Sequence, residues 1–400
     1  MALLVKNAVL DGEGTDCLIE NGVFTAIAPG LEAPVGGEVL DAGGAWIVPP
    51  FYNCHTHAPM NLFRGMADDL PLFDWLQNHI WPAEAKLTPA DIRRGAEEAV
   101  AEMVRTGTVF FNDMYWHSEE ILDAAVAAGM RACIGPCIID GPDGRLKPEC
   151  MDEVALVKER IAALPERTRR RIRFAYAPHA VYTVSEKSLC AVGEMAAADG
   201  ESFVHVHVSE TAKEVADCKE KYGMSPVALL DRCGLLGRRT VLAHCVHLSQ
   251  DDMELIAERG ATISHQPCSN YKLASGMFDY ANAVEKHGCR FTIGTDGSAS
   301  NNSLSMFGEM KLAALNAKVK SGDPTSGKAE DILKAATAGG AEAFGFDGGR
   351  IAVGALGDAL LVDPAVPQMK PMRNLASNLV YAADTLCVRA VVCDGKNLWK

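Results

Sequence analysis

The sequence lacks the features that define membrane proteins and nucleic-acid-binding proteins. No apolar run approaches the roughly 18 residues that a membrane-spanning helix needs. Positive charge is scarce, with 38 Lys and Arg against 52 Asp and Glu and a net charge of -14. A broad nucleic-acid-binding face needs clustered Lys and Arg, so this balance argues against one. The one dense basic run, residues 167–173, is expected to be a solvated helix end before a strand.

Two signatures of cofactor binding are also missing. The 13 cysteines never occur with Cys-x-x-Cys spacing, so we expect reduced thiols in the core rather than disulfides or a thiolate metal site. No Gly-x-Gly-x-x-Gly or Walker A sequence follows an early strand, which argues against a doubly wound nucleotide-binding sheet. The N-terminal stretch has no signal-peptide layout, and a cytoplasmic protein without a membrane partner is expected.

The middle of the chain alternates short apolar segments with amphipathic helical patterns such as 89–107 and 185–200. The expected strands are 51–57, 108–113, 131–138, 172–178, 203–208, 240–244, 261–265 and 290–296. Eight β-then-α units over about 300 residues are typical of an α/β protein with a (β/α)8 TIM barrel. The active site of such a barrel lies at the C-terminal ends of its strands.

Both ends of the chain are rich in short strand patterns. Asn21-Gly22 lies between two alternating runs and predicts a hairpin. Near the C-terminus, the expected strands are 358–363, 378–383 and 388–399. Four hundred residues exceed one ordinary core, so two domains are predicted. They are a small β-sandwich domain of residues 1–50 plus 347–400 and a catalytic barrel of residues 51–346.

Polar side chains collect at the C-terminal tips of the expected barrel strands. They are His55 and His57 on the first strand, His179 after the fourth, His207 on the fifth, His244 on the sixth and Asp296 on the eighth. A histidine pair alone is weak evidence, because buried histidines usually only form hydrogen bonds. Scattered core histidines, however, would show no preference for one end of the strands, so the pattern favours a metal site.

Strand spacing selects the candidate ligands. Residues i and i+2 on a strand share a face with Cα atoms about 6.6 Å apart, so His55 and His57 can converge on one ion. The fifth strand offers His205 and His207 on one face. His207 lies nearer the tip and is the expected ligand, whereas His205 is expected to be a hydrogen-bonded interior residue. Asp296 completes the set, although alone it would be interpreted as a turn-capping aspartate.

Three neutral imidazoles and one carboxylate predict a single catalytic divalent ion with an open position. Zinc is the first choice, and iron or manganese suits the same donors. Such an ion lowers the pKa of a bound water from about 15.7 to about 7. Glu210 lies three residues beyond His207, close enough to face that water. His244 is expected to orient the hydroxide or a developing oxyanion by hydrogen bonding, and its neighbour His247 is expected to be structural.

Several segments resemble the amidohydrolase superfamily, and within it the 5-methylthioadenosine/S-adenosylhomocysteine deaminases. They are "PPFYNCHTHAPMNLFRGMADDLPLFDWL", "IWPAEAKLT", "FAYAPHAVYT", "HVSET", "LAHCVHL", "HQPCSNYKLASG" and "GTDGSASNNSLSMFGEM". The resemblance implies that His55, His57, His207 and Asp296 hold one zinc or iron beside His244. It also implies that Glu210 is the proton shuttle, that Glu84 reaches the ribose hydroxyls and that His179 contacts the substrate. Binuclear relatives carry a lysine on the fourth strand, which "RIRFAYAP" lacks, so one metal is expected.

The expected function is hydrolytic deamination of the adenine ring of an adenosine derivative by a mononuclear metal hydroxide. 5-Methylthioadenosine, S-adenosylhomocysteine and adenosine are the candidate substrates, and the products are the inosyl compound and ammonia. A guanine or pterin deaminase and a triazine hydrolase are alternatives within the same fold; a ribose-binding Glu84, rather than a plain helix-entry residue, would argue against them. A non-catalytic binding scaffold is a remote alternative. The expected partner is a small purine nucleoside, and a homo-oligomer is compatible with the sequence.

Overall fold

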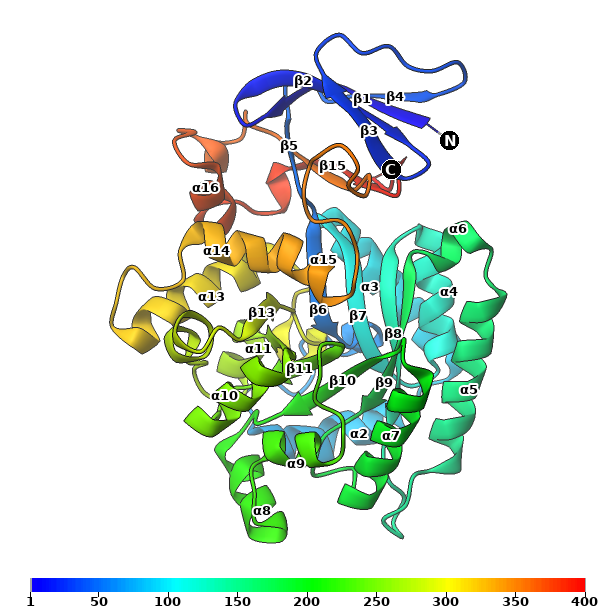
Figure 1. The fold of residues 1–400 in the computed structure, drawn as a ribbon, viewed down its shortest axis with the longest axis vertical. Coiled ribbons are helices and arrows are strands. Elements are labelled where there is room, and N and C mark those ends of the chain that lie inside the picture. Colours follow the sequence, from blue (N-terminus) through cyan, green and yellow to red (C-terminus); the bar gives the residue numbers. More distant parts are fainter. Residues whose placement is uncertain (1, 400) are drawn as a thin grey trace.

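The computed structural model describes residues 2–399 and contains two eight-stranded sheets. One is a parallel barrel sheet in which consecutive strands are neighbours (Figure 1). Its strands are β6 (Phe51–Thr56), β7 (Thr108–Tyr115), β8 (Arg131–Ile138), β9 (Ile172–Pro178), β10 (Phe203–Val208), β11 (Thr240–His244), β12 (Thr262–His265) and β13 (Arg290–Ile293). The N–H groups of Thr295 and Asp296 donate to the carbonyl of His55, at 3.1 and 2.9 Å, and so link the last strand to the first. The expected α/β barrel is confirmed.

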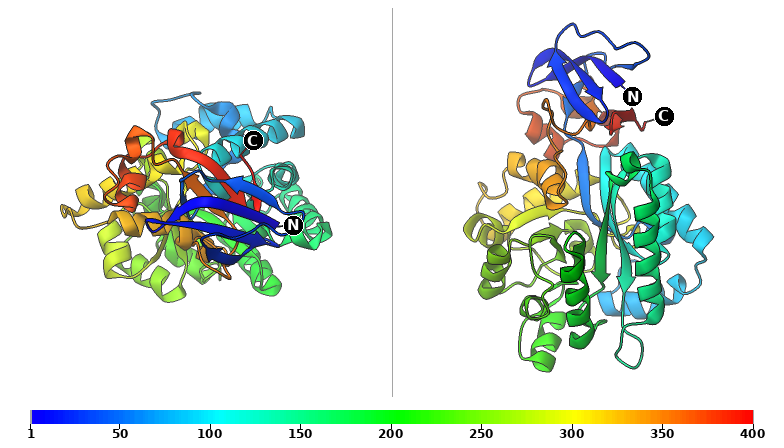
Figure 2. Two further views of the ribbon diagram at one scale, coloured as in Figure 1. Left: turned by 90° about the horizontal axis from the view of Figure 1, so that it is seen from above. Right: turned by 45° about the vertical axis from the view of Figure 1, so that its right-hand side comes forward.

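Helices connect the barrel strands and pack around them (Figures 1 and 2). The longer ones are α3 (Pro89–Arg105), α4 (Ser118–Ala128), α5 (Pro148–Ala163), α7 (Glu186–Asp199), α8 (Ala212–Tyr222), α10 (Gln250–Arg259) and α13 (Met306–Ser321). The short α-helices are α1 (Leu72–Asp74), α2 (Trp81–Glu84), α6 (Glu166–Arg169), α9 (Pro226–Arg232), α11 (Pro267–Lys272), α12 (Ser298–Asn301), α14 (Ala329–Lys334), α15 (Gly340–Ala343) and α16 (Leu375–Tyr381). Short 3-10 or π turns are η1 (Ala58–Phe63), η2 (Trp75–Ile80), η3 (Ala281–Lys286), η4 (Ala335–Gly339), η5 (Pro367–Met369) and η6 (Thr385–Cys387).

Local sequence explains where the helices begin and end. The Ser185 hydroxyl accepts the N–H of Ser188 at the start of α7, and Gly200 ends that helix with a φ of 70°. Thr88 and Asp91 form a reciprocal capping box at the start of α3. Both helices match the ranges that periodicity predicts. Within residues 2–399, no helix combines the length and the apolar character that crossing a membrane requires.

The second sheet joins strands from both ends of the chain, in the order β16-β15-β14-β5-β1-β2-β3, with β4 on β1. The strands are β1 (Ala2–Leu10), β2 (Glu13–Glu20), β3 (Val23–Ala28), β4 (Glu38–Asp41), β5 (Trp46–Val48), β14 (Ala359–Val362), β15 (Val388–Cys393) and β16 (Lys396–Asn397). Asn21 and Gly22 turn between β2 and β3 with φ of 53° and 81°, as the hairpin signal predicts. Both termini lie at this sheet, beyond one end of the barrel (Figure 2).

We propose residues 1–50 plus 347–400 and residues 51–346 as the two domains. Strand β5 ends at Val48 in the terminal sheet and β6 begins at Phe51 in the barrel, which supports the first boundary. A buried ion pair joins the two parts, since the Arg131 guanidinium on β8 donates to both oxygens of Asp358 at 2.7 and 2.9 Å. The Tyr52 hydroxyl and the N–H of Asp394 also donate to this carboxylate.

One expected strand is wrong. Residues 378–383 lie mostly in helix α16 rather than in a strand. The Asn374 side chain accepts the N–H of Ser377 and caps the helix, and Leu379 and Val380 are buried on one side of it. A short apolar run fits a buried strand and a buried helix equally well, and the cap four residues upstream decides between them.

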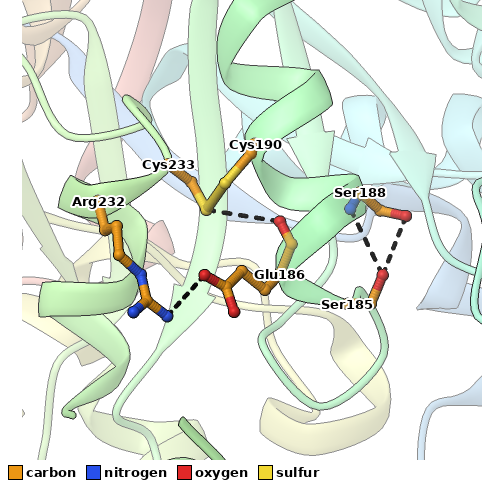
Figure 3. The surroundings of a disulfide bond; sticks show 6 residues. All are labelled: Ser185, Glu186, Ser188, Cys190, Arg232 and Cys233. Atoms are coloured by element: carbon orange, nitrogen blue, oxygen red, sulfur yellow. Dashed lines mark hydrogen bonds and ion pairs between the residues drawn. A yellow bond between two sulfur atoms is a disulfide. The ribbon is translucent and has the colours of Figure 1, made fainter. Parts of the chain in front are cut away.

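The expectation of cysteines without disulfides is also wrong at one pair. Cys190 on α7 is bonded to Cys233, which follows α9 (Figure 3). The Arg232 guanidinium is 2.7 Å from the Glu186 carboxylate beside the disulfide. The two cysteines are separated by 43 positions, so spacing gave no signal for the pair. The other eleven cysteines are free, and all except Cys268 are buried.

Candidate active site

A cavity of about 640 Å³ opens over the C-terminal ends of the barrel strands. Tryptophan and leucine side chains form much of its wall, including Leu72, Trp75 and Trp81. All the predicted site residues except His55 line it, namely His57, Glu84, His179, His207, Glu210, His244 and Asp296. His55 is fully buried beneath this cavity. The fold therefore brings the sequence-predicted residues together in one place.

His57 and His207 are held by main-chain carbonyls. The Nδ1 atom of His57 lies 2.6 Å from the carbonyl of Met114 at the end of β7. The Nδ1 atom of His207 lies 2.7 Å from the carbonyl of His179. A carbonyl only accepts, so each Nδ1 carries the hydrogen and each neutral ring keeps a lone pair on Nε2. Those two Nε2 atoms lie 3.1 Å apart.

His55 is held by another imidazole. Its Nδ1 lies 2.7 Å from Nε2 of His205, which is fully buried and is a hydrogen-bonded interior residue, as expected. The Nε2 atom of His55 is buried without a hydrogen-bond partner and lies 3.4 Å from Oδ1 of Asp296. Burial lowers the pKa of His55 to about 4, so its ring is neutral at pH 7.

Asp296 closes the cluster from the segment after β13. Its Oδ1 is also 3.4 Å from Nε2 of His57, and its Oδ2 accepts a hydrogen bond from the Ser269 hydroxyl at 2.7 Å. Burial alone would raise the pKa of Asp296, but the facing histidines hold it well below its usual range. Asp296 has a φ of 63°, an uncommon conformation for a residue other than glycine that is typical of functional sites.

The donor set fits one divalent cation. Ligand atoms of His55, His57 and Asp296 lie within 4.8 Å of one another, and so do those of His55, His207 and His244. Three buried nitrogens lack a hydrogen to share. Nε2 of His55 has no hydrogen-bond partner, and the Nε2 atoms of His57 and His207 face each other with lone pairs. A cation would satisfy all three. Burial lowers the pKa values of both His57 and His207, so neutral rings are available as ligands.

Glu210 lies just after β10 and is buried, with 3% of its surface exposed. Its Oε1 accepts a hydrogen bond from the Ser275 hydroxyl at 3.2 Å, and its Oε2 lies 3.8 Å from Nε2 of His244. Burial raises the pKa of Glu210, although the nearby His244 opposes this effect. A carboxyl whose pKa is raised towards neutrality can both take up and release a proton.

His244 ends β11 with its ring between two carboxylates. Its Nδ1 lies 2.8 Å from the side-chain oxygen of Asn270, and its Nε2 lies 3.9 Å from Oδ2 of Asp296. Burial lowers the pKa of His244, but Glu210 and Asp296 outweigh burial and raise it above its ordinary value. The neighbouring His247 bonds to the carbonyl of Ser275 at 2.6 Å, a structural contact that supports the loop carrying Ser275.

Glu84 and His179 both lie on the cavity wall, and the His179 ring centroid is 4.8 Å from that of His207. Burial raises the pKa of Glu84, at the end of α2, to about 7, against the opposing effect of the nearby Tyr115 hydroxyl. The Nδ1 atom of His179 lies 2.9 Å from the Thr183 hydroxyl oxygen. Burial, together with the neighbouring histidines, lowers the pKa of His179 to about 3, so it is neutral. Both residues can therefore offer hydrogen bonds to a ligand in the cavity.

Sequence reasoning missed the residues that support the cluster. Ser269, Asn270 and Ser275 come from one segment after β12 and hold Asp296, His244 and Glu210 respectively. Hydroxyl and amide side chains are common in loops, and nothing in their spacing marks them. The segment "HQPCSNYKLASG" was the only signal, as part of the resemblance to amidohydrolases.

The sequence model of the amidohydrolase family matches residues 46–398. The chain belongs to this family. It is 40% identical over 404 residues to 5-methylthioadenosine/S-adenosylhomocysteine deaminase of Thermococcus onnurineus, covering 100% of this chain and 94% of the relative. It is 40% identical over 400 residues to 5'-deoxyadenosine deaminase of Methanothermobacter thermautotrophicus, covering 99% and 92%. The crystal structure of an adenosine deaminase from Xanthomonas campestris with bound zinc is similar, with 37% identity, a TM-score of 0.90 and coverage of 99% and 92%.

Proposed function

We propose that this amidohydrolase deaminates the adenine ring of adenosine derivatives, with water as co-substrate and ammonia as a product. One observation carries the proposal. Three buried imidazoles with free lone pairs lie together with the Asp296 carboxylate at the floor of the cavity, and Glu210 lines the same cavity. The relatives at 40% identity over the whole chain are deaminases of such compounds, which supports the same reaction here.

We propose His55, His57, His207 and Asp296 as the ligands of one divalent ion. Zinc is the preferred ion, because the similar Xanthomonas enzyme contains zinc, and iron or manganese is the alternative. When bound, the ion supplies Lewis-acid activation of a water molecule. The carbonyls of Met114 and His179 and the ring of His205 orient the three imidazoles, so little reorganisation is needed for binding.

Glu210 is the proposed proton carrier. Its carboxylate takes a proton from the attacking water and delivers it to N1 of the adenine ring, while the oxygen forms a bond to C6. The tetrahedral carbon then holds both a hydroxyl and the amino group. A second proton moves from the hydroxyl to the amino group, the C6–N bond breaks, and ammonia leaves while C6 keeps the oxygen as a carbonyl. The Ser275 hydroxyl keeps Oε1 in place through these steps, and the raised pKa of Glu210 suits both uptake and release.

His244 is proposed to stabilise the incoming oxygen. The side-chain oxygen of Asn270 accepts the hydrogen of Nδ1, and the raised pKa of His244 favours a second hydrogen on Nε2. The Asn270 amide nitrogen lies 3.4 Å from Nδ1 of His265, a contact that supports this orientation of the amide. His244 therefore donates from Nε2 towards the oxygen that gains negative charge, and Asp296 accepts a hydrogen bond on the same side.

Glu84 favours a nucleoside over a bare heterocycle. We propose that its carboxylate accepts hydrogen bonds from the ribose hydroxyls and that His179 contacts the purine. With guanine or a triazine in the cavity, Glu84 would keep only the nearby Tyr115 hydroxyl and would have no sugar hydroxyl to bind. A binding scaffold is disfavoured because the ligand set and Glu210 are all present. A small purine nucleoside is thus the proposed partner. We propose a cytoplasmic protein because eleven of the 13 cysteines are free, with the Cys190–Cys233 pair as the exception.

The proposed function is tested by an ammonia-release screen on metal-loaded protein, with elemental analysis of the same sample. The panel contains adenosine, 5-methylthioadenosine, S-adenosylhomocysteine, 5'-deoxyadenosine, free adenine, guanine and substituted triazines. We expect ammonia from the adenosine derivatives, with one metal ion per chain. Faster turnover of guanine or of a triazine would overturn the proposal.

A further inference from the structure

Glu214 bonds to the main chain of the proposed proton carrier. Its carboxylate, only 2% exposed, lies in the first turn of α8. One oxygen accepts the N–H of Ser209 at 2.9 Å, and the other accepts the N–H of Glu210 at 2.8 Å. Both oxygens are therefore used on two successive amides of the turn that presents Glu210 to the cavity.

The turn needs such support because of its conformation. Ser209 has a φ of 53°, a left-handed conformation that residues other than glycine rarely adopt. Its carbonyl accepts the N–H of His247 at 2.8 Å. The turn is thus held from one side by Glu214 and from the other by the segment after β11. This backbone direction places the Glu210 side chain between Ser275 and His244.

These contacts go beyond an ordinary helix cap. Thr211 is the N-cap of α8, and its hydroxyl accepts the N–H of Glu214 at 3.2 Å. In the usual capping box the acid three residues later bonds back to the N–H of the N-cap residue. Asp252 does this at the start of α10, where it accepts the N–H of Ser249 at 2.9 Å. The Glu214 carboxylate instead accepts the N–H groups of Glu210 and Ser209, which lie one and two positions before the N-cap residue.

We infer that Glu214 is a positioning residue that fixes Glu210 for proton transfer, an inference that rests on the proposed function. Glu214 lies outside the metal cluster and does not line the cavity. Its effect on the reaction therefore passes through the main chain of Ser209 and Glu210. The carboxylate form is suited to this task, because each of its two oxygens can accept one amide hydrogen.

The variant Glu214→Gln separates this role from simple stability. Its amide group offers one oxygen and one NH2, so one buried N–H of the turn loses its acceptor. A small misplacement of a catalytic group costs about 100-fold in rate, so we expect kcat to fall by about 10-fold to 100-fold. We expect KM to stay within about threefold and metal content to be unchanged, because neither the cavity wall nor the ligands change.

Asp252→Asn is the matched control. Asp252 also caps the first turn of a barrel helix and is 3% exposed, but it has no contact with the Ser209–Glu210 turn. We expect this control to lose thermal stability with kcat within about twofold of the parent protein. If Glu214→Gln loses metal, or if the two variants have the same kcat, Glu214 is only a structural residue and the inference fails.

Hydrogen exchange of residues 203–212 tests the same contacts without any substrate. The amides of this peptide should exchange faster in Glu214→Gln than in the parent protein, and Asp252→Asn should leave them unchanged. Equal exchange in the two variants would overturn the inference, whatever the activity. If the parent protein releases no ammonia from any adenosine derivative, the proposed function is refuted. Hydrogen exchange would then still show whether Glu214 holds the Ser209–Glu210 turn.

Discussion

The Nε2 atoms of His57 and His207 lie 3.1 Å apart, while the Nδ1 atom of each ring lies against a main-chain carbonyl. In the neutral rings both Nε2 atoms carry lone pairs, so no hydrogen joins them. Two lone pairs facing each other in a buried place repel. A cation between them would remove the repulsion and would use the orphaned Nε2 of His55 as well. This relationship makes metal binding the first property to measure.

We expect His207→Ala to lose the metal and His205→Asn to weaken its binding. Removal of His207 deletes a ligand, whereas removal of His205 deletes the ring acceptor that orients His55. Changes of such supporting partners cost about 10-fold to 100-fold in metal affinity. Elemental analysis after dialysis, followed by chelator competition, measures both effects. His287→Ala, outside the cluster, should behave like the parent protein, and a His207→Ala protein that keeps one metal per chain would contradict the ligand set.

Glu210→Gln should keep the metal and lose turnover. The amide retains the shape of the side chain but cannot carry a proton between water and the ring, and general acid–base catalysis contributes about 100-fold to 10,000-fold. Steady-state ammonia release at saturating substrate measures the loss. Glu149→Gln makes the same substitution on the cavity wall and is the control. Near-parental activity in Glu210→Gln would remove Glu210 from the mechanism.

The centre of the site could be predicted from sequence because strand geometry is regular. His55 lies on β6 and His57 directly follows that strand, two residues further on. The depth of His207 relative to His205 on β10 follows from counting residues to the strand end. Asp296 is less regular, since β13 ends at Ile293 and Asp296 lies beyond it in a left-handed conformation. Its place at the site was predicted from the resemblance and from the order of the strands, whereas its backbone conformation was not predicted.

The supporting residues and one C-terminal element could not be predicted in the same way. Asn270 lies in the short helix α11 and Ser275 in the loop after it, and the side-chain directions of both residues depend on tertiary packing. The cap at Asn374 made residues 375–381 helical although their apolar pattern also suits a strand. The Cys190–Cys233 pair depends on how α7 and α9 pack, which no local spacing reports.

Binding of the ribose should depend on pH through Glu84. Burial raises the pKa of Glu84 to about 7, so its carboxylate gains a proton as the pH falls through about 7 and accepts sugar hydroxyls less well. We expect KM for adenosine to rise relative to KM for free adenine below about pH 7. The ratio of the two KM values removes titrations that both substrates share, including that of Glu210. Glu84→Gln should give a ratio that is flat with pH, and an unchanged slope would exclude ribose contact.

The number of titratable thiols should change on reduction. Protein denatured without reductant should react with a thiol reagent at the eleven free cysteines, and reduced protein should react at all 13. The difference corresponds to the Cys190–Cys233 disulfide. In Cys190→Ser protein, the number of reactive thiols should be the same with and without reduction. Thirteen reactive thiols in both samples would show that the pair is reduced in solution.

Arg131→Met should destabilise the fold without changing the chemistry of the site. The guanidinium and the Asp358 carboxylate are 2% and 0% exposed, so loss of one partner leaves a buried charge without its counter-ion. Such a loss costs about 3–5 kcal/mol. The exposed pair Arg259–Asp231 has the same 2.7 Å contact, and Arg259→Met should destabilise the protein far less, because water screens an exposed ion pair.

Denaturant unfolding of metal-loaded protein measures both changes, and ammonia release per folded molecule should stay at the parental level in both variants. A second substitution at Asp358 should not restore stability, because the Tyr52 hydroxyl and the N–H of Asp394 would then lose their acceptor. Equal costs for Arg131→Met and Arg259→Met would contradict the view that this ion pair fastens the terminal sheet to the barrel. A large cost for Arg131→Met alone would show that the stability of the protein depends on this contact between the barrel and the C-terminal strands of the terminal sheet.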